Sequence, residues 1–207
     1  MRYRKIPSET IRRLPTYFRA LHYSADESKV NISSQDLAES LGLNPWQIRK
    51  DFSYFGDFGT PGVGYNIEKL IKHIKKILKL HVVRKAALVG VGNLGSAILT
   101  YPGFEVYGFE VAAAFDSNPK KIGKKIEDVT IEAVSKLKTL KRRKINVGII
   151  ATPRDVTQEV ADMLVEAGVK GILNFSPCRI AVPSKVKVIT IDIATDLARL
   201  AYYMPSN

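Results

Sequence analysis

The spacing of hydrophobic residues changes near residue 85. Before that point apolar residues recur at helical intervals, and after it they gather in short runs typical of buried strands. The second part predicts strands over residues 86–90, 111–116, 145–151, 171–174 and 186–191, which alternate with helices. Such alternation is typical of a parallel sheet covered on both faces. The chain is therefore predicted to be an α/β protein in which a helical domain precedes a doubly wound parallel sheet.

Two helices are predicted at the front of the chain. Ser8 is expected to cap the first, whose buried stripe is Ile11, Leu14, Phe18 and Leu21, and Pro15 is expected to weaken or kink it. Ser33 and Asp36 form a capping-box pattern that starts a short second helix. Gly42 is expected to close that helix in the left-handed conformation.

A third helix follows after a tight turn at residues 42–44. Asn44 is its predicted cap and Pro45 its first residue, and its buried stripe is Ile48, Phe52 and Phe55. The outward face is predicted to carry Gln47, Arg49, Lys50, Ser53 and Tyr54. Two short helices joined by so tight a turn predict a helix-turn-helix, with the N-terminal end of the third helix in the major groove. A three-helix bundle with a solvated charged face is the simpler alternative. Asp51 argues for caution, because a carboxylate beside phosphates is unfavourable unless it pairs with a cation of the same helix.

Residues 56–65 contain four glycines within nine positions and predict a hairpin wing. Residues 66–80 predict an amphipathic helix that connects two domains, with five lysines opposite its apolar side. The predicted DNA-binding set therefore comprises helix and wing residues, namely Asn44, Gln47, Arg49, Lys50, Ser53, Tyr54, Phe58, Gly59 and Thr60. The expected domain boundaries are 1–80, 81–190 and 191–207.

The net charge of +12 is concentrated at the front of the chain. Residues 1–85 hold 16 Lys and Arg against 8 Asp and Glu, whereas residues 86–207 hold 16 against 12. A concentrated positive field raises affinity for phosphates, so a nucleic acid is the expected partner of the first part. Charge alone would also fit a solubilising surface.

Composition limits the remaining classes. A length of 207 residues with 45% hydrophobic content suits two small folded domains. No run of about 18 apolar residues and no secretory signal is apparent, so we expect no membrane partner. The single cysteine, Cys178, excludes an internal disulfide and a cysteine-rich zinc site, and we predict no metal site. The cytoplasm is the expected location.

A G-x-G-x-x-G motif follows the first predicted strand and opens an apolar helix. In that context it predicts a dinucleotide loop, formed by Gly90, Val91, Gly92, Asn93, Leu94 and Gly95. Asp116 ends the second predicted strand, where a carboxylate accepts hydrogen bonds from the ribose hydroxyls and favours NAD(H) over NADP(H). Lys120 and Lys121 follow closely enough to weaken that preference, although both are equally well explained as surface lysines. A glycine-rich turn without a ligand is the alternative to the whole motif.

The second domain lacks the residues expected of a dehydrogenase. All three histidines precede residue 90, so the domain has no imidazole to act as a general base. Cys178 has no histidine of its own domain to activate it, and a packed thiol is the simpler interpretation. Polar residues follow the strands at 145–151 and 171–174, where the nicotinamide would lie, and the predicted cofactor set there is Thr152, Pro153, Asn174 and Phe175. We therefore predict that the protein is not an enzyme.

Several strings taken together resemble the Rex family of redox-sensing transcriptional repressors. They cover nearly the whole chain in matching order and comprise residues 49–56, 62–65, 90–95, 101–104 and 171–175. The resemblance implies a winged-helix domain, a Rossmann domain and a C-terminal helix exchanged between the subunits of a homodimer. It also implies repression at an inverted-repeat operator when NADH is low, and release when NADH binds.

The resemblance further implies roles for individual residues. Tyr101 would lie at the nicotinamide side, and Arg19 and Asp192 would form a redox-dependent ionic contact between domains. Pro61 departs from the family, which often has a basic residue there. The minor-groove contact is therefore expected to be weaker, or to come from Arg2, Arg4 and Lys5.

Two alternatives stay open. One is an NAD- or coenzyme A-binding enzyme or carrier whose front segment is a dimerisation module. The other is a repressor whose effector is coenzyme A or another adenine nucleotide.

Overall fold

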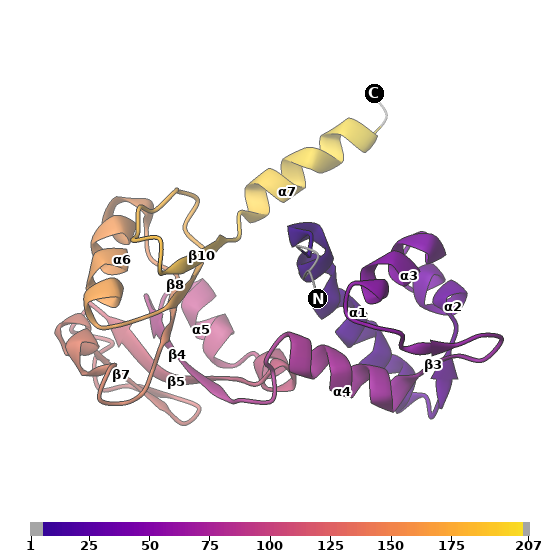
Figure 1. The fold of residues 1–207 in the computed structure, drawn as a ribbon. Coiled ribbons are helices and arrows are strands. Elements are labelled where there is room, and N and C mark those ends of the chain that lie inside the picture. The colour runs from indigo at the N-terminus through magenta and orange to yellow at the C-terminus, as the bar shows by residue number, and fades with distance from the viewer. Residues whose placement is uncertain (1–5, 205–207) are drawn as a thin grey trace. The chain divides into compact units, whose positions relative to one another are not determined.

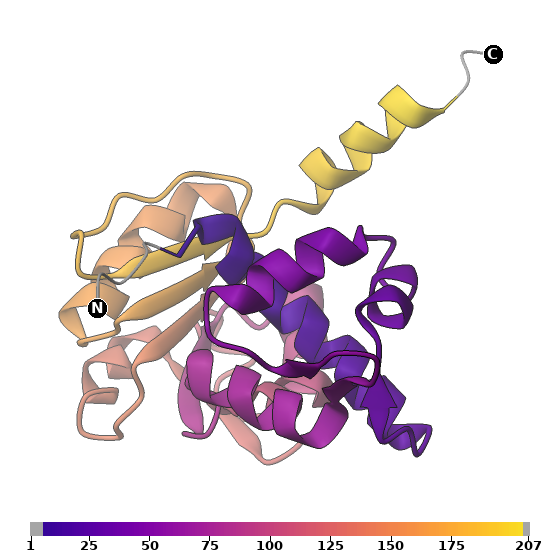
Figure 2. The same ribbon diagram turned by 45° about the vertical axis from the view of Figure 1, so that its right-hand side comes forward.

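The computed structural model describes residues 6–204, and the chain divides into two compact units, Met1–Val82 and Val83–Asn207. Unit 1 contains α1 (Ser8–Asp26), α2 (Ser34–Glu39), α3 (Pro45–Ser53) and α4 (Ile67–Ile77). A small antiparallel sheet joins β1 (Asn31–Ile32), β3 (Gly64–Asn66) and β2 (Gly59–Thr60) in the order β1-β3-β2. Within this unit α1 packs along α4 (Figure 1 and Figure 2). Unit 1 is therefore a winged helix, as predicted.

The turn signals of unit 1 act as the sequence indicates. Ser33 and Asp36 form a complete capping box, in which the Asp36 N–H donates to Ser33 Oγ at 3.0 Å. Gly42 is left-handed, with φ +62°. Asn44 caps α3 by accepting the N–H of Trp46 at 2.8 Å, and Pro45 is the first helical residue. These caps place α3 after a tight turn.

Three details of the helix predictions were wrong. The cap position of α1 is Pro7, which offers no side-chain cap, and Ser8 is already helical. Ile11 is 39% exposed, because the buried face of α1 is shifted toward Thr10 and Tyr17, which find polar partners inside the unit. Phe55 lies beyond the end of α3 and is only partly buried.

The wing is a hairpin with a proline turn. The N–H of Val63 donates to the carbonyl of Thr60 at 3.0 Å, and Gly62 has φ +77°. A proline followed by a glycine of positive φ is typical of a type II turn. Pro61 therefore shapes the wing tip, whose residues from Gly59 to Val63 are exposed.

Unit 2 is built on one large sheet. Its strands are β4 (Arg84–Val89), β5 (Phe109–Asp116), β6 (Lys125–Ile126), β7 (Val129–Ala133), β8 (Val147–Ile150), β9 (Gly171–Asn174) and β10 (Lys187–Thr190). The order is β10-β9-β8-β4-β5-β7-β6, and the pairs are parallel except β6 with β7. The direction of connection reverses between β4 and β8, and such a switch point is where open α/β sheets bind ligands.

Helices cover both faces of this sheet. On one face α6 (Thr157–Glu166) shares a core with Ala87 and Val89, and on the other α5 (Asn93–Leu99) shares a core with Ala86 and Leu88. Figure 1 shows the two helices on opposite sides of the sheet. Alternate residues of β4 therefore serve two cores, as the doubly wound prediction requires.

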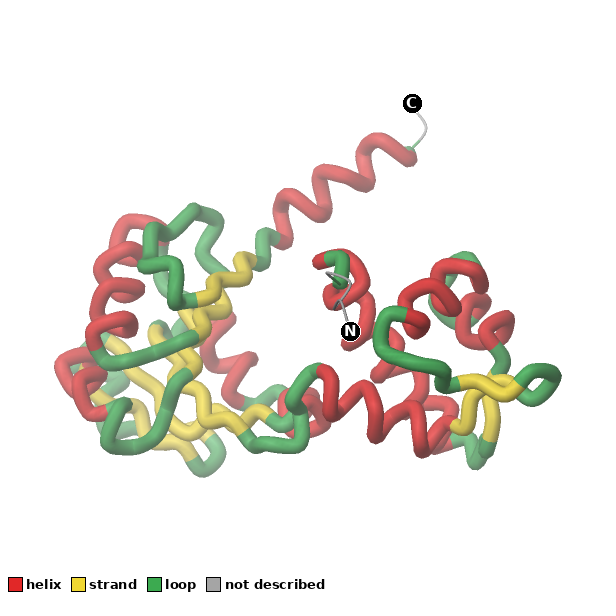
Figure 3. The backbone as a smooth tube through the Cα atoms, viewed as in Figure 1, coloured by secondary structure: helices red, strands yellow, loops and turns green. Residues whose placement is uncertain are grey.

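Other connections of unit 2 are not α-helical. A β6–β7 hairpin follows β5, a short helix η2 (Val134–Thr139) leads to β8, and residues 175–186 join β9 to β10 as a loop. Figure 3 shows this last connection as a loop. Buried apolar residues fill the place of the missing helices, among them Leu137, Leu140, Ile180 and Val186. The prediction of regularly alternating helices was thus too simple.

The final described segment is α7 (Ile193–Leu200) followed by η4 (Ala201–Tyr203). All residues of α7 are exposed, including Ile193 and Leu197, at 66% and 65%. No helix within residues 6–204 is long and apolar enough to cross a membrane.

Candidate functional site

The predicted dinucleotide loop, residues 90–95 and here called the phosphate loop, runs from the end of β4 into the first turn of α5. Gly90 has φ +94°, and a Cβ there would lie 2.6 Å from the carbonyl oxygen of Ala151. A Cβ on Gly95 would overlap the carbonyl of Gly90, whereas one on Gly92 would meet nothing within 4 Å. The first and third glycines therefore permit tight packing, and the middle glycine leaves its backbone open to a ligand.

The start of α5 supplies donors next to that opening. The first N–H groups of a helix have no acceptor within the helix, so those of Asn93 and Leu94 are available to an anion. Leu94 is 41% exposed and Asn93 is exposed. The loop thus fits a pyrophosphate by its shape and by its donors.

Asp116 lies at the carboxyl end of β5 and is tied to the phosphate loop. Its carboxylate accepts the N–H of Val91 at 2.9 Å, the N–H of Asn118 at 2.8 Å and the Nζ of Lys121 at 3.0 Å. Burial favours the neutral acid, but these hydrogen bonds outweigh it and lower the pKa of Asp116. The carboxylate is therefore held ionised at this edge of the sheet, and its contact with a ribose stays a prediction.

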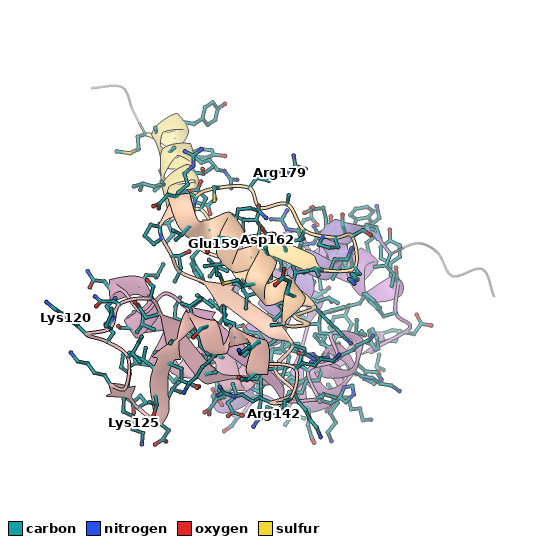
Figure 4. All side chains as sticks on the ribbon, turned by 90° about the vertical axis from the view of Figure 1, so that its left-hand side faces the viewer. Lys120, Lys125, Arg142, Glu159, Asp162 and Arg179 are labelled. Atoms are coloured by element: carbon teal, nitrogen blue, oxygen red, sulfur yellow. The ribbon has the colours of Figure 1, made fainter. Side chains whose placement is uncertain are left out.

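The two lysines after Asp116 differ in position. Lys121 forms an ion pair with Asp116, so its interpretation as a simple surface lysine was wrong. Lys120 is exposed, and Figure 4 shows it pointing outward from the loop that follows β5. Only Lys121 is close enough to reduce the negative charge that Asp116 presents.

Tyr101 precedes the short helix η1 (Pro102–Tyr107) and is 59% exposed. Its ring contacts Phe104 edge to face at a centroid distance of 5.1 Å. A Cβ on Gly103 would overlap the Tyr101 ring, so that glycine allows the ring to lie over the backbone. The result is an accessible aromatic surface beyond the end of α5.

Polar residues gather where β8 and β9 end. The methyl group of Thr152 lies 2.9 Å from where a Cβ on Gly90 would fall, and its hydroxyl lies 3.4 Å from that of Thr157. Pro153 is exposed. Asn174 is fully buried, and its amide donates to the carbonyls of Ser176 and Cys178 at 3.1 and 2.9 Å. Asn174 thus shapes the loop after β9.

The sequence analysis missed a small hydroxyl cluster at this edge. The hydroxyls of Thr157 and Ser176 lie 2.8 Å apart, and both residues are almost fully buried. Cys178 Sγ lies 3.5 Å from Ser176 Oγ. Phe175 is partly buried among the apolar residues on the α5 face of the sheet. Thr157 begins α6, and a threonine soon after the predicted strand at 145–151 was the available signal.

The polar side chains of α3 are held by neighbours in unit 1. Arg49 donates to Ser34 Oγ at 2.8 Å, and Lys50 Nζ lies 4.6 Å from the centroid of the exposed Trp46 ring. Ser53 is exposed and Tyr54 is partly buried. The two cations are therefore oriented before any DNA is bound.

Asp51 is not a surface carboxylate. Its side chain is completely buried, and Arg13 of α1 binds it through Nε at 2.6 Å and Nη2 at 2.8 Å. Thr10, Tyr17 and Gln47 also donate to it, at 2.9, 2.6 and 3.0 Å. Burial favours the neutral acid, but the hydrogen bonds from Arg13 and its neighbours lower the pKa of Asp51. Asp51 therefore pairs with Arg13, a cation of another helix rather than of α3, and does not present an unpaired charge to phosphates.

That cluster also corrects the prediction that Gln47 simply faces outward, because its amide is bound to Asp51. Thr10, Arg13 and Tyr17 were missed, although their spacing of three and four residues along α1 is a polar stripe on one helix face.

The wing residues divide into an anchor and a tip. Phe58 packs on the rings of Phe52 and His73, at centroid distances of 6.0 and 4.8 Å, so its side chain fixes the base of the wing. Gly59 and Thr60 are exposed. Arg2, Arg4 and Lys5 lie outside the described residues.

The predicted switch pair is split between the units. Arg19 is an exposed residue of α1. Asp192 caps α7, where the N–H and the hydroxyl of Thr195 donate to it at 3.1 and 2.8 Å and lower its pKa. The contact between Arg19 and Asp192 stays a prediction.

Comparison with known proteins assigns both units. Residues 83–178 match the family model "CoA binding domain", and residues 5–53 match "Putative DNA-binding protein N-terminus". The chain is 46% identical to the redox-sensing transcriptional repressor Rex of Chloroflexus aurantiacus over 199 residues. The alignment covers 96% of this chain and 94% of that protein. The chain belongs to the Rex family of redox-sensing transcriptional repressors. The resemblance stated from the sequence is confirmed, and Rex-family membership decides for a regulator over an enzyme.

Solved Rex-family structures agree with this assignment. The crystal structure of RSP in complex with β-NAD+ and operator DNA matches with a TM-score of 0.90 at 39% identity, covering 97% of this chain and 93% of that one. The structure of RSP with β-NADH matches with a TM-score of 0.87 at 37% identity, covering 97% and 94%. The winged-helix and Rossmann folds are thus those of a Rex-family repressor.

Proposed function

We propose that this Rex-family protein represses transcription as a homodimer bound to an inverted-repeat operator, and that NADH binding to unit 2 releases it. The proposal is carried by two features of one chain: a winged helix with oriented cations on α3, and a phosphate loop tied to the ionised Asp116. The repressor acts in the cytoplasm.

The DNA-binding half of the proposal rests on α3 and the wing. Arg49 at the middle of α3 and Lys50 in its last turn are both exposed, on the helix that is proposed to lie in the major groove. The exposed wing tip, Gly59 to Val63, has no cation of its own and contributes through its backbone and Thr60. Phosphate contacts by Lys and Arg make the affinity strongly dependent on salt.

The effector half rests on the phosphate loop and Tyr101. The middle glycine of the loop leaves room for a pyrophosphate, and Asp116 accepts the ribose hydroxyls. Tyr101 offers an accessible ring against which an uncharged reduced nicotinamide can be buried. An oxidised nicotinamide is positively charged, and burying that charge is costly. This difference is the physical basis of redox discrimination.

Dimerisation is proposed to use α7. Ile193, Leu197 and Leu200 recur at helical spacing and are 66%, 65% and 53% exposed, an arrangement expected of a surface that a second subunit covers. A dimer with two recognition helices spans half-sites about 34 to 36 Å apart, and rotation between the subunits breaks that spacing. To shift the population from 1:99 to 99:1 between the two arrangements, NADH must bind one arrangement more tightly than the other by about 5.5 kcal/mol. Two bound cofactors would share that difference.

The decisive experiment is a fluorescence-anisotropy titration on inverted-repeat DNA from the protein's own promoter regions, at fixed salt. Binding that NADH abolishes and NAD+ spares would support the proposal. Tyr101→Phe and Asp192→Ala should each weaken the effect of NADH. If neither variant does so, the switch residues are wrongly assigned.

Coenzyme A is a second candidate effector, because unit 2 matches a CoA-binding family model. The β-NAD+ and β-NADH bound to RSP support the nicotinamide effector. Competition of coenzyme A with NADH for the purified protein separates the two. DNA binding that responds to coenzyme A alone would favour the second candidate.

A further inference from the structure

The buried carboxylate of Asp51 directly contacts a side chain predicted to read DNA. Gln47 lies in the first turn of α3, one helical turn before Asp51, and its Nε2 donates to Asp51 Oδ1 at 3.0 Å. We propose that Asp51 is a positioning residue that sets which edge of the Gln47 amide faces the operator, and so contributes to base specificity. The proposal rests on the proposed function, in which α3 enters the major groove.

The argument starts from the donor and acceptor groups. An ionised carboxylate only accepts hydrogen bonds, and a glutamine amide has one accepting oxygen and one donating NH2 group. Asp51 is held in the ionised form, because Arg13 binds it through two nitrogens and Tyr17 donates to it. Gln47 must therefore turn its NH2 group toward Asp51.

The orientation of Gln47 has a consequence for DNA. With Nε2 bound to Asp51, the oxygen Oε1 and the second N–H face away from the carboxylate. An oxygen beside an N–H matches the N6 amino group and N7 of adenine, the usual partner of glutamine in the major groove. A glutamine without this restraint could rotate its amide by half a turn at little cost. Asp51 removes that freedom before binding.

The rest of the cluster holds Asp51 itself. Arg13, Tyr17 and Thr10 all come from α1, so the carboxylate joins α3 to α1. Asp51 is completely buried, and an unpaired charge in that position is strongly unfavourable. The carboxylate therefore has one well-defined place, and Gln47 is oriented against a rigid reference.

The test compares base preference, because a purely structural residue would change affinity alone. Full-length protein is titrated onto operators in which each half-site position carries each of the four bases, at fixed salt. Asp51→Asn replaces an acceptor-only group with an amide, so Gln47 can turn either way. We expect preference for adenine at one position to fall roughly tenfold, the discrimination that one good bidentate contact supplies. Gln47→Met should lose the preference at the same position.

Tyr17→Phe is the matched control. It removes one hydrogen bond to the other oxygen of Asp51 and leaves the Gln47 contact in place. Its base preferences should equal those of the wild type, even where stability or overall affinity falls. If Asp51→Asn and Tyr17→Phe lower affinity alike at every position, Asp51 is only structural and the proposal is wrong.

A measurement on the wild type covers the case in which Asp51→Asn does not fold. Nuclear Overhauser contacts should place the Gln47 amide protons beside Thr10, which shares the same oxygen of Asp51. A Gln47 amide that reorients freely in the wild type would overturn the inference. Failure of the wild type to bind any inverted repeat would instead overturn the proposed function.

Discussion

Replacing Gly90 by alanine tests whether the phosphate loop depends on close packing. Gly90 has φ +94°, and a Cβ there would lie 2.6 Å from the Ala151 carbonyl oxygen and 2.9 Å from Thr152 Cγ2. The unfavourable backbone conformation costs about 1 to 2 kcal/mol, and forcing atoms into a packed site costs about 1 to 3 kcal/mol more. Gly90→Ala should therefore lower the free energy of unfolding by about 2 to 5 kcal/mol.

The control is Gly92→Ala in the same loop. A Cβ on Gly92 meets nothing within 4 Å, and its φ of −84° suits alanine. Its stability should stay within about 0.5 kcal/mol of the wild type. Its NADH affinity should nevertheless fall, because the added methyl group occupies the space through which the pyrophosphate approaches the backbone.

Calorimetry measures the unfolding of both variants, and the fluorescence of NADH measures its binding. One kcal/mol shifts the midpoint by about 4 °C for a domain of this size, so Gly90→Ala should lower the transition of unit 2 by about 8 to 20 °C. Trp46 is the single tryptophan and lies in unit 1, so its fluorescence follows that unit separately. The reasoning would be refuted if Gly90→Ala were as stable as the wild type, or if Gly92→Ala were destabilised as much as Gly90→Ala.

Four further predictions address other parts of the chain. Trp46→Ala removes the ring that orients Lys50, a cation–π contact of about 0.5 to 1 kcal/mol, and should lower operator affinity about two- to fivefold in anisotropy titrations. Trp46→Phe should retain most of the affinity. Asp116→Asn should weaken NADH binding and raise the affinity for NADPH relative to NADH, since the carboxylate no longer repels a 2′-phosphate. Burial lowers the pKa of His22 below 6.5. As the pH falls, His22 is therefore protonated in the unfolded state before it is protonated in the folded state, so the free energy of unfolding measured in urea titrations should fall below about pH 6.5. His22→Gln should remove that pH dependence. Leu197→Asp should convert the proposed dimer to a monomer in sedimentation experiments and abolish tight operator binding.

Each of these predictions has an outcome that contradicts it. Equal affinities of the Trp46 variants would show that the ring does not orient the lysine. An unchanged NADPH to NADH ratio in Asp116→Asn would remove the carboxylate from cofactor selection. A pH profile that His22→Gln leaves unchanged would assign the dependence to another group. A dimeric Leu197→Asp would move the interface away from α7.

The sequence by itself determined the features that depend on local chemistry. The caps at Ser33 and Asn44 and the left-handed Gly42 involve residues only a few positions apart. The local sequence pattern is therefore enough to predict their structures. The phosphate loop was equally readable, because the glycine motif and the strand and helix that flank it lie within one short stretch of sequence. The alternation of apolar strands was enough to predict a parallel sheet with two covered faces. Where Asp116 would lie also followed, because the carboxyl ends of parallel strands share one edge.

Tertiary structure decided the features that depend on partners far apart in the chain. The buried face of α1 turns away from Ile11 because Asp51, about forty residues later, binds Thr10 and Tyr17. The same burial turns Asp51 from an expected repulsive charge into the fixed reference for Gln47. A short 3-10 helix and a loop replace predicted helices where apolar residues such as Leu137 and Ile180 cover the sheet. Periodicity reports which residues prefer to be buried, but the partner that buries them, and the direction in which a polar group then points, exist only in the folded chain.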